Sequence, residues 1–197
     1  MDKKSKINSI KNLYEITQIL TKYNIKYWIQ DGTLLGYYRD NDIINHDKDT
    51  DIGLFWDDFK NKKNAVNEIL SKRFKLYKVK GNYDDSLMIS FSKNGEWTDL
   101  FFYYHDVSYI YHCALGKKNR LYKFYYNQFS VKEINFKSYT FFAPENEEYF
   151  LETKYGSEWN IPKTKWKNIT DPLNAIETDT YVDPKRSKKK FKIWLRT

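Results

Sequence analysis

Residues 46–53 of the chain read HDKDTDIG, and an apolar Leu-Phe pair follows directly. Successive side chains of a β-strand point to opposite faces of a sheet. A strand over Asp49–Phe55 therefore places Asp47, Asp49 and Asp51 on one face, while the apolar residues at its end anchor it in a core. The stretch predicts a row of carboxylates at the edge of a buried sheet.

Carboxylates on one face of a strand repel each other unless a cation lies between them. Mg²⁺ takes oxygen ligands and is commonly held by one or two carboxylates together with substrate phosphates. Asp99 offers a third acid, because it lies in the apolar run Trp97–Phe102, where an unpaired charge is costly. If the two strands are neighbours, Asp49, Asp51 and Asp99 form one metal site for Mg²⁺ or Mn²⁺ that suits phosphoryl chemistry, with Asp99 as a ligand or as the general base.

A glycine turn precedes this stretch. Gly32 and Thr33 follow a short apolar strand expected over Ile25–Ile29, and a helix is expected to open at Thr33. Amides at the start of a helix can hold phosphate, and glycine allows close approach of the backbone. Arg39 and Lys48 lie near in the sequence and are expected to pair with phosphate oxygens.

The rest of the chain supplies alternating helix and strand signals. An inner face of Ile7, Ile10, Leu13 or Tyr14, Thr17 and Leu20 recurs at helical spacing, which predicts an amphipathic helix over residues 6–22. The other expected elements are helices over 57–72 and from Pro144 to Tyr155, strands over 74–79, 86–91 and 97–104, a hairpin turn at Asn94-Gly95, and short strands and turns over 107–143. This order predicts an α/β or α+β domain with a mixed sheet flanked by helices and an aromatic-rich C-terminal extension.

The composition fits one domain over residues 1–182 and a basic tail over 183–197. The chain has 197 residues, 19% of them aromatic, and no apolar run long enough for a membrane span, so disorder and a spanning helix are excluded. No apolar segment follows the charged first residues, so no signal peptide is expected. The single cysteine, Cys113, suits a reducing, cytoplasmic setting.

The net charge of +8 lies at the two ends of the chain. Residues 183–197 hold seven lysines and arginines and one acid, and the body between the ends is neutral. A neutral body argues against a long nucleic acid as partner. The tail is either a solvated terminus or a peripheral contact with an anionic membrane surface. Its apolar residues can bury at an interface or dock on the body, and the sequence does not predict the oligomeric state.

The linked motifs resemble the LicD family of the nucleotidyltransferase-fold superfamily, which includes the animal proteins fukutin and fukutin-related protein. The resemblance rests on YWIQDGTLLGYYR (residues 27–39), on HDKDTDIG, and on the segment KYGSEWNIP (residues 154–162), and it covers about residues 23–170. The continuation Lys163–Lys167 is similar to fukutin.

The resemblance implies Mg²⁺-dependent transfer of a phospho-alcohol group from a CDP-activated donor to a glycan hydroxyl, with release of CMP. The group would be ribitol phosphate, glycerol phosphate or phosphocholine. It implies that Asp49 and Asp51 are metal ligands, that Asp99 is the third acid, and that Gly32 and Thr33 form the donor-phosphate turn. Lys163 and Trp166 are further candidates for substrate contact, although Trp166 also suits a packing role.

Other interpretations use the same residues. A nucleotidyltransferase that moves NMP from an NTP to a small molecule, protein or RNA needs the same acids, and a binding module that keeps only the fold is the third alternative. His46 suits phosphate contact or loop packing. His112-Cys113 lacks further ligands and suits a structural role better than a metal site. The tyrosines of 103–126, with interleaved cations, suit a sugar or base as well as ordinary packing.

Overall fold

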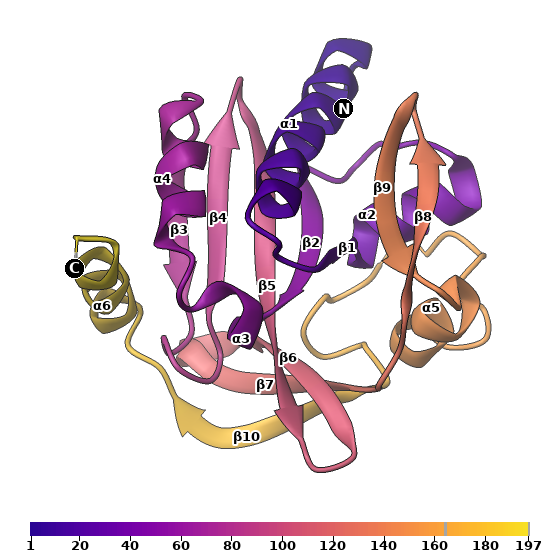
Figure 1. The fold of residues 1–197 in the computed structure, drawn as a ribbon. Helices are drawn as coiled ribbons and strands as arrows, with labels where there is room; N and C mark the ends of the chain where they lie inside the picture. The colour runs from indigo at the N-terminus through magenta and orange to yellow at the C-terminus, as the bar shows by residue number, and fades with distance from the viewer. Residues whose placement is uncertain (164, 197) are drawn as a thin grey trace.

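A mixed sheet forms the centre of the molecule, as the element order predicts (Figure 1). The structure is a computed structural model and describes residues 1–163 and 165–196. The eight strands of the sheet are β1 (Tyr27–Ile29), β2 (Asp49–Phe55), β3 (Lys75–Lys80), β4 (Met88–Lys93), β5 (Glu96–Asp106), β6 (Tyr109–Leu115), β7 (Arg120–Asn127) and β10 (Ala175–Tyr181). A separate hairpin consists of β8 (Val131–Phe136) and β9 (Tyr139–Pro144).

The long strand β5 joins two parts of this sheet. Its first part lies between β2 and β4, which gives the strand order β1-β2-β5-β4-β3. Its last residues pair with β6, and β7 and β10 follow. Within the described chain, β2 and β5 are the parallel pair, and the other strand pairs are antiparallel. Figure 1 shows β7 and β10 running across the lower ends of the other strands.

Helices cover the sheet and connect its strands. They are α1 (Lys3–Lys22), α2 (Asp31–Leu35), α3 (Trp56–Phe59), α4 (Lys63–Ser71), α5 (Glu147–Tyr155) and α6 (Pro184–Arg196), with a π-helical turn over Gly36–Asp40 and a 3₁₀ turn over Lys117–Asn119. Helix α1 packs against β5 and β2, with α4 beside it (Figure 1). The short α2 follows β1 and contacts β2 and α5, so it lies close to the carboxylate-bearing strand.

Helix α1 follows the predicted periodicity with one correction. Its N-cap Asp2 accepts a hydrogen bond from the backbone N–H of Ser5 at 2.7 Å, and Leu13 and Leu20 are fully buried. Ile7, predicted on the inner face, is 45% exposed. The buried stripe is centred on Leu13 and Leu20 and extends to Ile16 on its other side, so Ile7 lies beside the stripe.

Two other helix predictions were wrong in their boundaries. The helix predicted over 57–72 is divided into α3 and α4, because the polar residues 60–62 bury nothing and the chain turns there to bring both apolar faces to the core. The helix predicted from Pro144 begins at Glu147 instead. Pro144 closes β9 opposite Val131, and the side chain of Asn146 caps α5 by accepting from the N–H of Tyr149 at 3.1 Å.

The basic segment predicted over 183–197 is helical over α6, which is docked on the body, and Thr197 lies outside the described residues. Phe191 is fully buried, and the ring of Trp194 lies 5.6 Å from that of Phe59. The indole N–H of Trp194 donates to the carbonyl of Lys60 at 2.9 Å. The lysines and arginines of α6 are exposed on its outer face. None of the described helices combines the length and apolarity that a bilayer crossing requires.

Candidate active site

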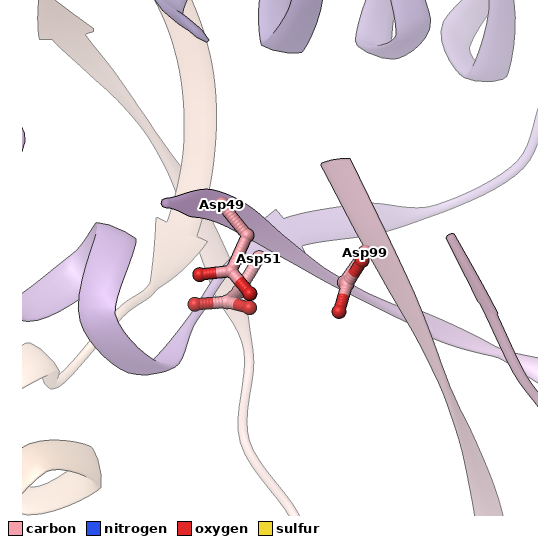
Figure 2. Close-up of side chains that lie close together, drawn as sticks. All are labelled: Asp49, Asp51 and Asp99. Carbon is pink, nitrogen blue, oxygen red and sulfur yellow. The ribbon is translucent and has the colours of Figure 1, made fainter. Parts of the chain in front are cut away.

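The parallel pairing of β2 with β5 brings three carboxylates together. Asp51 lies directly opposite Asp99, and Asp49 lies two residues earlier on the same face of β2. One carboxylate oxygen of each residue lies within 4.8 Å of those of the other two. Figure 2 shows the carboxylates of Asp49 and Asp51 next to each other, with Asp99 on the neighbouring strand. β2 and β5 are therefore neighbouring strands, as the sequence analysis expected.

Burial raises the pKa of all three carboxyl groups. The pKa of Asp99 rises to about 6. The pKa of Asp51 rises well above its ordinary value, through burial first and then through the negative charges of Asp49 and Asp31. Burial also raises the pKa of Asp49, against the opposing charge of Lys78. The chemistry of this all-oxygen donor set fits a hard divalent cation, which would offset both the burial and the mutual repulsion.

Asp47 does not belong to the strand, although the alternation predicted it there. β2 begins at Asp49, and Asp47 lies after a turn in which its backbone N–H donates to the carbonyl of Ile44 at 3.1 Å. Its carboxylate lies over Gly32, where an added Cβ would collide with it. Burial raises the pKa of Asp47 to about 6. Asp47 therefore approaches the site from the side of α2, and glycine at position 32 makes this approach possible.

Thr33 holds β2 in position. Its hydroxyl accepts a hydrogen bond from the backbone N–H of Asp51 at 2.8 Å, and the residue is 2% exposed. The sequence predicted Thr33 as a phosphate contact, whereas here its hydroxyl binds the protein backbone. Gly32, its neighbour, lines the cavity described next.

A cavity of about 280 Å³ lies over the carboxylates. The predicted site residues in its wall are Gly32, Arg39, Asp49, Asp51, Asp99, Lys163 and Trp166. Thr33 is buried and Lys48 is exposed, and neither residue lines the cavity. Arg39 is held by Asp40 through two hydrogen bonds of 2.9 and 2.8 Å. The ammonium group of Lys163 lies 5.6 Å from the ring centre of Trp166. The structure thus gathers most of the predicted residues around one space.

A buried ion pair forms part of the cavity wall. The ammonium group of Lys154 in α5 lies 2.5 Å from a carboxylate oxygen of Asp31 in α2, and both side chains are almost completely buried. Sequence reasoning missed both residues. The signal for Lys154 is its place on the buried face of α5, after Glu147, Phe150 and Leu151 at helical spacing. A lysine on such a face needs a buried acid as partner.

The histidines of the sequence analysis have different surroundings. His46 lies in the cavity wall. His112 and Cys113 also line the cavity, but they are not part of a metal-binding cluster among the described residues. His112 stacks on Phe124 at 4.9 Å, and burial lowers its pKa to about 4, which leaves the imidazole neutral at pH 7. Burial raises the pKa of the Cys113 thiol.

The tyrosines of residues 103–126 belong largely to the packing between β5, β6 and β7. Tyr103 and Tyr126 are fully buried, with ring centres 5.9 Å apart. Tyr111 lies beneath the ammonium group of Lys123, which is 4.1 Å from its ring centre. Phe124 of this range and Phe101, just before it, line the cavity.

Comparison with known proteins identifies the family. Residues 24–146 match the family described as LicD/FKTN/FKRP, nucleotidyltransferase domain. The chain belongs to this family. Over 170 residues it is 28% identical to ribitol-5-phosphate transferase FKTN of Homo sapiens, a match that covers 85% of this chain and 36% of that protein. The match to FKTN of Mus musculus has 28% identity over 174 residues, with coverages of 84% and 37%. This LicD/FKTN/FKRP domain thus spans little more than a third of these relatives.

The fold of this family member is also found in a solved structure. The antibiotic-resistance factor ANT(2'')-Ia aligns with a TM-score of 0.50 at 12% sequence identity, over 85% of this chain and 80% of that chain. At this identity the likeness concerns the fold alone. It agrees with the nucleotidyltransferase-like fold that the resemblance to the LicD family implies.

Proposed function

We propose that this domain transfers a phospho-alcohol group from a CDP-activated donor to a glycan hydroxyl, and that it requires Mg²⁺ or Mn²⁺. The group is of the ribitol phosphate, glycerol phosphate or phosphocholine type. The observation that carries the proposal is the cluster of Asp49, Asp51 and Asp99 in the cavity wall. Membership in the family of FKTN, which is named a ribitol-5-phosphate transferase, supports the choice of reaction.

The reaction forms one phosphorus–oxygen bond, breaks another, and moves one proton. The acceptor oxygen bonds to the phosphorus that carries the alcohol, the bond from that phosphorus to the oxygen of CMP breaks, and CMP leaves. A carboxylate of the cluster takes the proton of the attacking hydroxyl, and Asp99 suits that role if it is not a ligand of the cation. Asp49 and Asp51 would hold the cation, with Asp99 as the third ligand if it is not the base, and the bound cation would stabilise charge on the phosphoryl oxygens.

The remaining wall residues bind and orient the substrates. Arg39 presents a guanidinium group already oriented by Asp40. Lys163 and Trp166 add a cation and an aromatic face to the cavity wall, which suits binding of the cytosine base or the acceptor sugar. Gly32 lets the carboxylate of Asp47 lie against α2 in the cavity wall.

The test is CMP release from CDP-ribitol, CDP-glycerol and CDP-choline in the presence of Mg²⁺. Asp49→Ala and Asp51→Ala should each abolish release while the circular dichroism spectrum stays native. Asp58→Ala is the matched control, because Asp58 is an acid outside the cavity wall. Full activity in both cavity variants would overturn the proposal. Pyrophosphate release from an NTP, with no CMP release from any CDP-alcohol, would instead identify a nucleotidyltransferase.

A further inference from the structure

A row of residues crosses four strands of the sheet and ends at the carboxylates. Lys78 of β3 lies opposite Ser90 of β4, Ser90 lies opposite Asp99 of β5, and Asp99 lies opposite Asp51 of β2. Residues directly opposite each other in a ladder project from the same face of a sheet. Lys78 therefore shares a face with the acidic cluster. Lys80, two residues further along β3, shares that face as well and lines the cavity.

A bulge in β3 sets this arrangement. Leu76 pairs with Phe91, but the next pair is Lys78 with Ser90, so Tyr77 is an extra residue in the strand. After the bulge, Val79 pairs with Ile89 and is buried in the core. The two lysines on either side of Val79 therefore project away from that core, toward the carboxylate face.

The charges of both lysines reach the cluster. Burial raises the pKa of Asp99, and the positive charges of Lys78 and Lys80 act against this rise. The same two charges oppose the rise at Asp49. The strand between, β4, contributes the small buried Ser90 to this row, so no bulky side chain there separates Lys78 from Asp99.

Lys80 differs from the other cations of the cavity wall. Arg39 is paired with Asp40, Lys154 with Asp31, and Lys163 lies against Trp166. The ammonium group of Lys80 makes no ion pair and no hydrogen bond with any other residue in the described part of the chain. Three carboxylates ionised around one divalent cation would leave a net negative charge, which would oppose the binding of a diphosphate. Anion binding here needs further positive charge.

We propose that Lys80, with Lys78 beside it, binds the diphosphate of the nucleotide donor from the β3 side of the cavity. This assignment rests on the proposed function, because it takes the substrate to be a nucleoside diphosphate ester. The acids and the lysines then grip the same group from neighbouring strands. Lys80 is the direct ligand, since it lines the cavity, and Lys78 adds charge from the edge.

The test compares the binding of CDP, inorganic pyrophosphate and cytidine by calorimetry, with Mg²⁺ present. Lys80→Met should weaken CDP and pyrophosphate binding by roughly tenfold or more, the size expected for a charge-assisted hydrogen bond, and leave cytidine binding unchanged. Lys80→Arg should retain most of the affinity, and Lys78→Met should have a smaller effect. Lys72→Met, an exposed lysine after α4, is the matched control and should bind as the wild type does.

The outcomes separate the two proposals. If the wild type binds CDP and releases CMP while Lys80→Met binds CDP equally well, the assignment of Lys80 is wrong and the function stands. Equal weakening of CDP and cytidine would also overturn it, because a general disturbance of the cavity would then explain the loss. If the wild type binds neither CDP nor pyrophosphate, both proposals fail together.

Discussion

Asp49, Asp51 and Asp99 are three acids that the fold places together at the cost of stability. Burial and mutual repulsion raise their pKa values, so the charged forms that the reaction needs are disfavoured in the ion-free protein. Side chains held in this way are typical of functional sites, where stability is given up for chemistry. Replacing one of these acids with a neutral residue should therefore raise the stability of the ion-free protein and lower its activity.

Asp99→Asn should stabilise the ion-free protein at neutral pH. The folded-state pKa of Asp99, about 6, exceeds its ordinary value of 3.8, which corresponds to a cost on the order of 2–3 kcal/mol when the group is ionised. The cost is absent below about pH 4 and complete above about pH 6, so the wild type loses this stability as pH rises through that window. Urea unfolding in EDTA should give the variant a higher free energy of unfolding than the wild type at pH 7 and an equal one at pH 4.

Mg²⁺ provides the complementary measurement. It should raise the melting temperature of the wild type, because a ligand of the native state stabilises it, and should fail to do so in Asp99→Asn. A variant less stable than the wild type at pH 7 in EDTA would contradict the electrostatic account of the cluster.

The sequence could predict these acids because their signals are local. Asp49 and Asp51 alternate with apolar residues along a strand, and Asp99 interrupts an apolar run. Asp31 and Lys154 have no such relation, since 122 positions and several elements separate them and only tertiary packing brings them together. Lys80 was missed for a similar reason, because its face depends on the bulge at Tyr77.

Thr33 and Asp51 connect α2 to β2. Thr33→Val should lower stability by about 1–2 kcal/mol, because the buried N–H of Asp51 loses its acceptor. Turnover should fall as well, since the Asp51 carboxylate is no longer held, and Thr33→Ser should restore both properties. Thermal melts and CMP release measure the two effects. Native stability with lost turnover in Thr33→Val would instead indicate that the hydroxyl contacts the substrate.

The Asp31–Lys154 pair connects α2 to α5. Lys154→Met should destabilise the protein by about 3–5 kcal/mol, because it leaves the Asp31 charge buried and unpaired. The double variant Asp31→Asn/Lys154→Met should recover much of this loss, which denaturant unfolding would measure. Additive losses in the double variant would show that the pair contributes through packing and not through charge.

Elements with strong local signals were predicted well, and those that depend on packing were not. The turn Asn94-Gly95 joins β4 and β5 with both residues at positive φ, as the hairpin signal predicts. The division of α3 from α4 followed from the need to bury two apolar faces at different angles. β10 carries little apolar patterning, with most of its residues exposed, and it forms because the edge of β7 offers it hydrogen-bond partners.

The charge of the whole molecule is concentrated by α6. Its apolar residues pack on the body near Phe59, which leaves its basic residues exposed. The helix lies beside α4 and β3, on the opposite side of the molecule from the hairpin β8–β9 (Figure 1). The basic residues that the sequence analysis assigned to a peripheral membrane contact therefore lie on a helix. The membrane contact itself remains a prediction.

The protein should bind vesicles that contain phosphatidylserine and should leave vesicles of phosphatidylcholine alone. Each basic residue near an anionic surface contributes about 1 kcal/mol, so replacing Lys185, Lys188, Lys189 and Lys192 with Glu should abolish sedimentation with the vesicles. High salt should weaken the wild-type interaction. Equal sedimentation of wild type and variant would assign the basic face to no membrane role.

The extra residue in β3 has a consequence for comparing this chain with its relatives. A strand of the same length without the bulge would pair Tyr77 with Ser90 and Lys78 with Ile89, which would turn the two lysines toward the core and Val79 toward the carboxylate face. A relative that lacks one position there needs no bulge and presents the lysines on the same face, whereas one of equal length with regular pairing presents Lys-Val-Lys the other way round. In such an alignment, the presence or absence of this bulge carries as much information about ligand recognition as the lysines do.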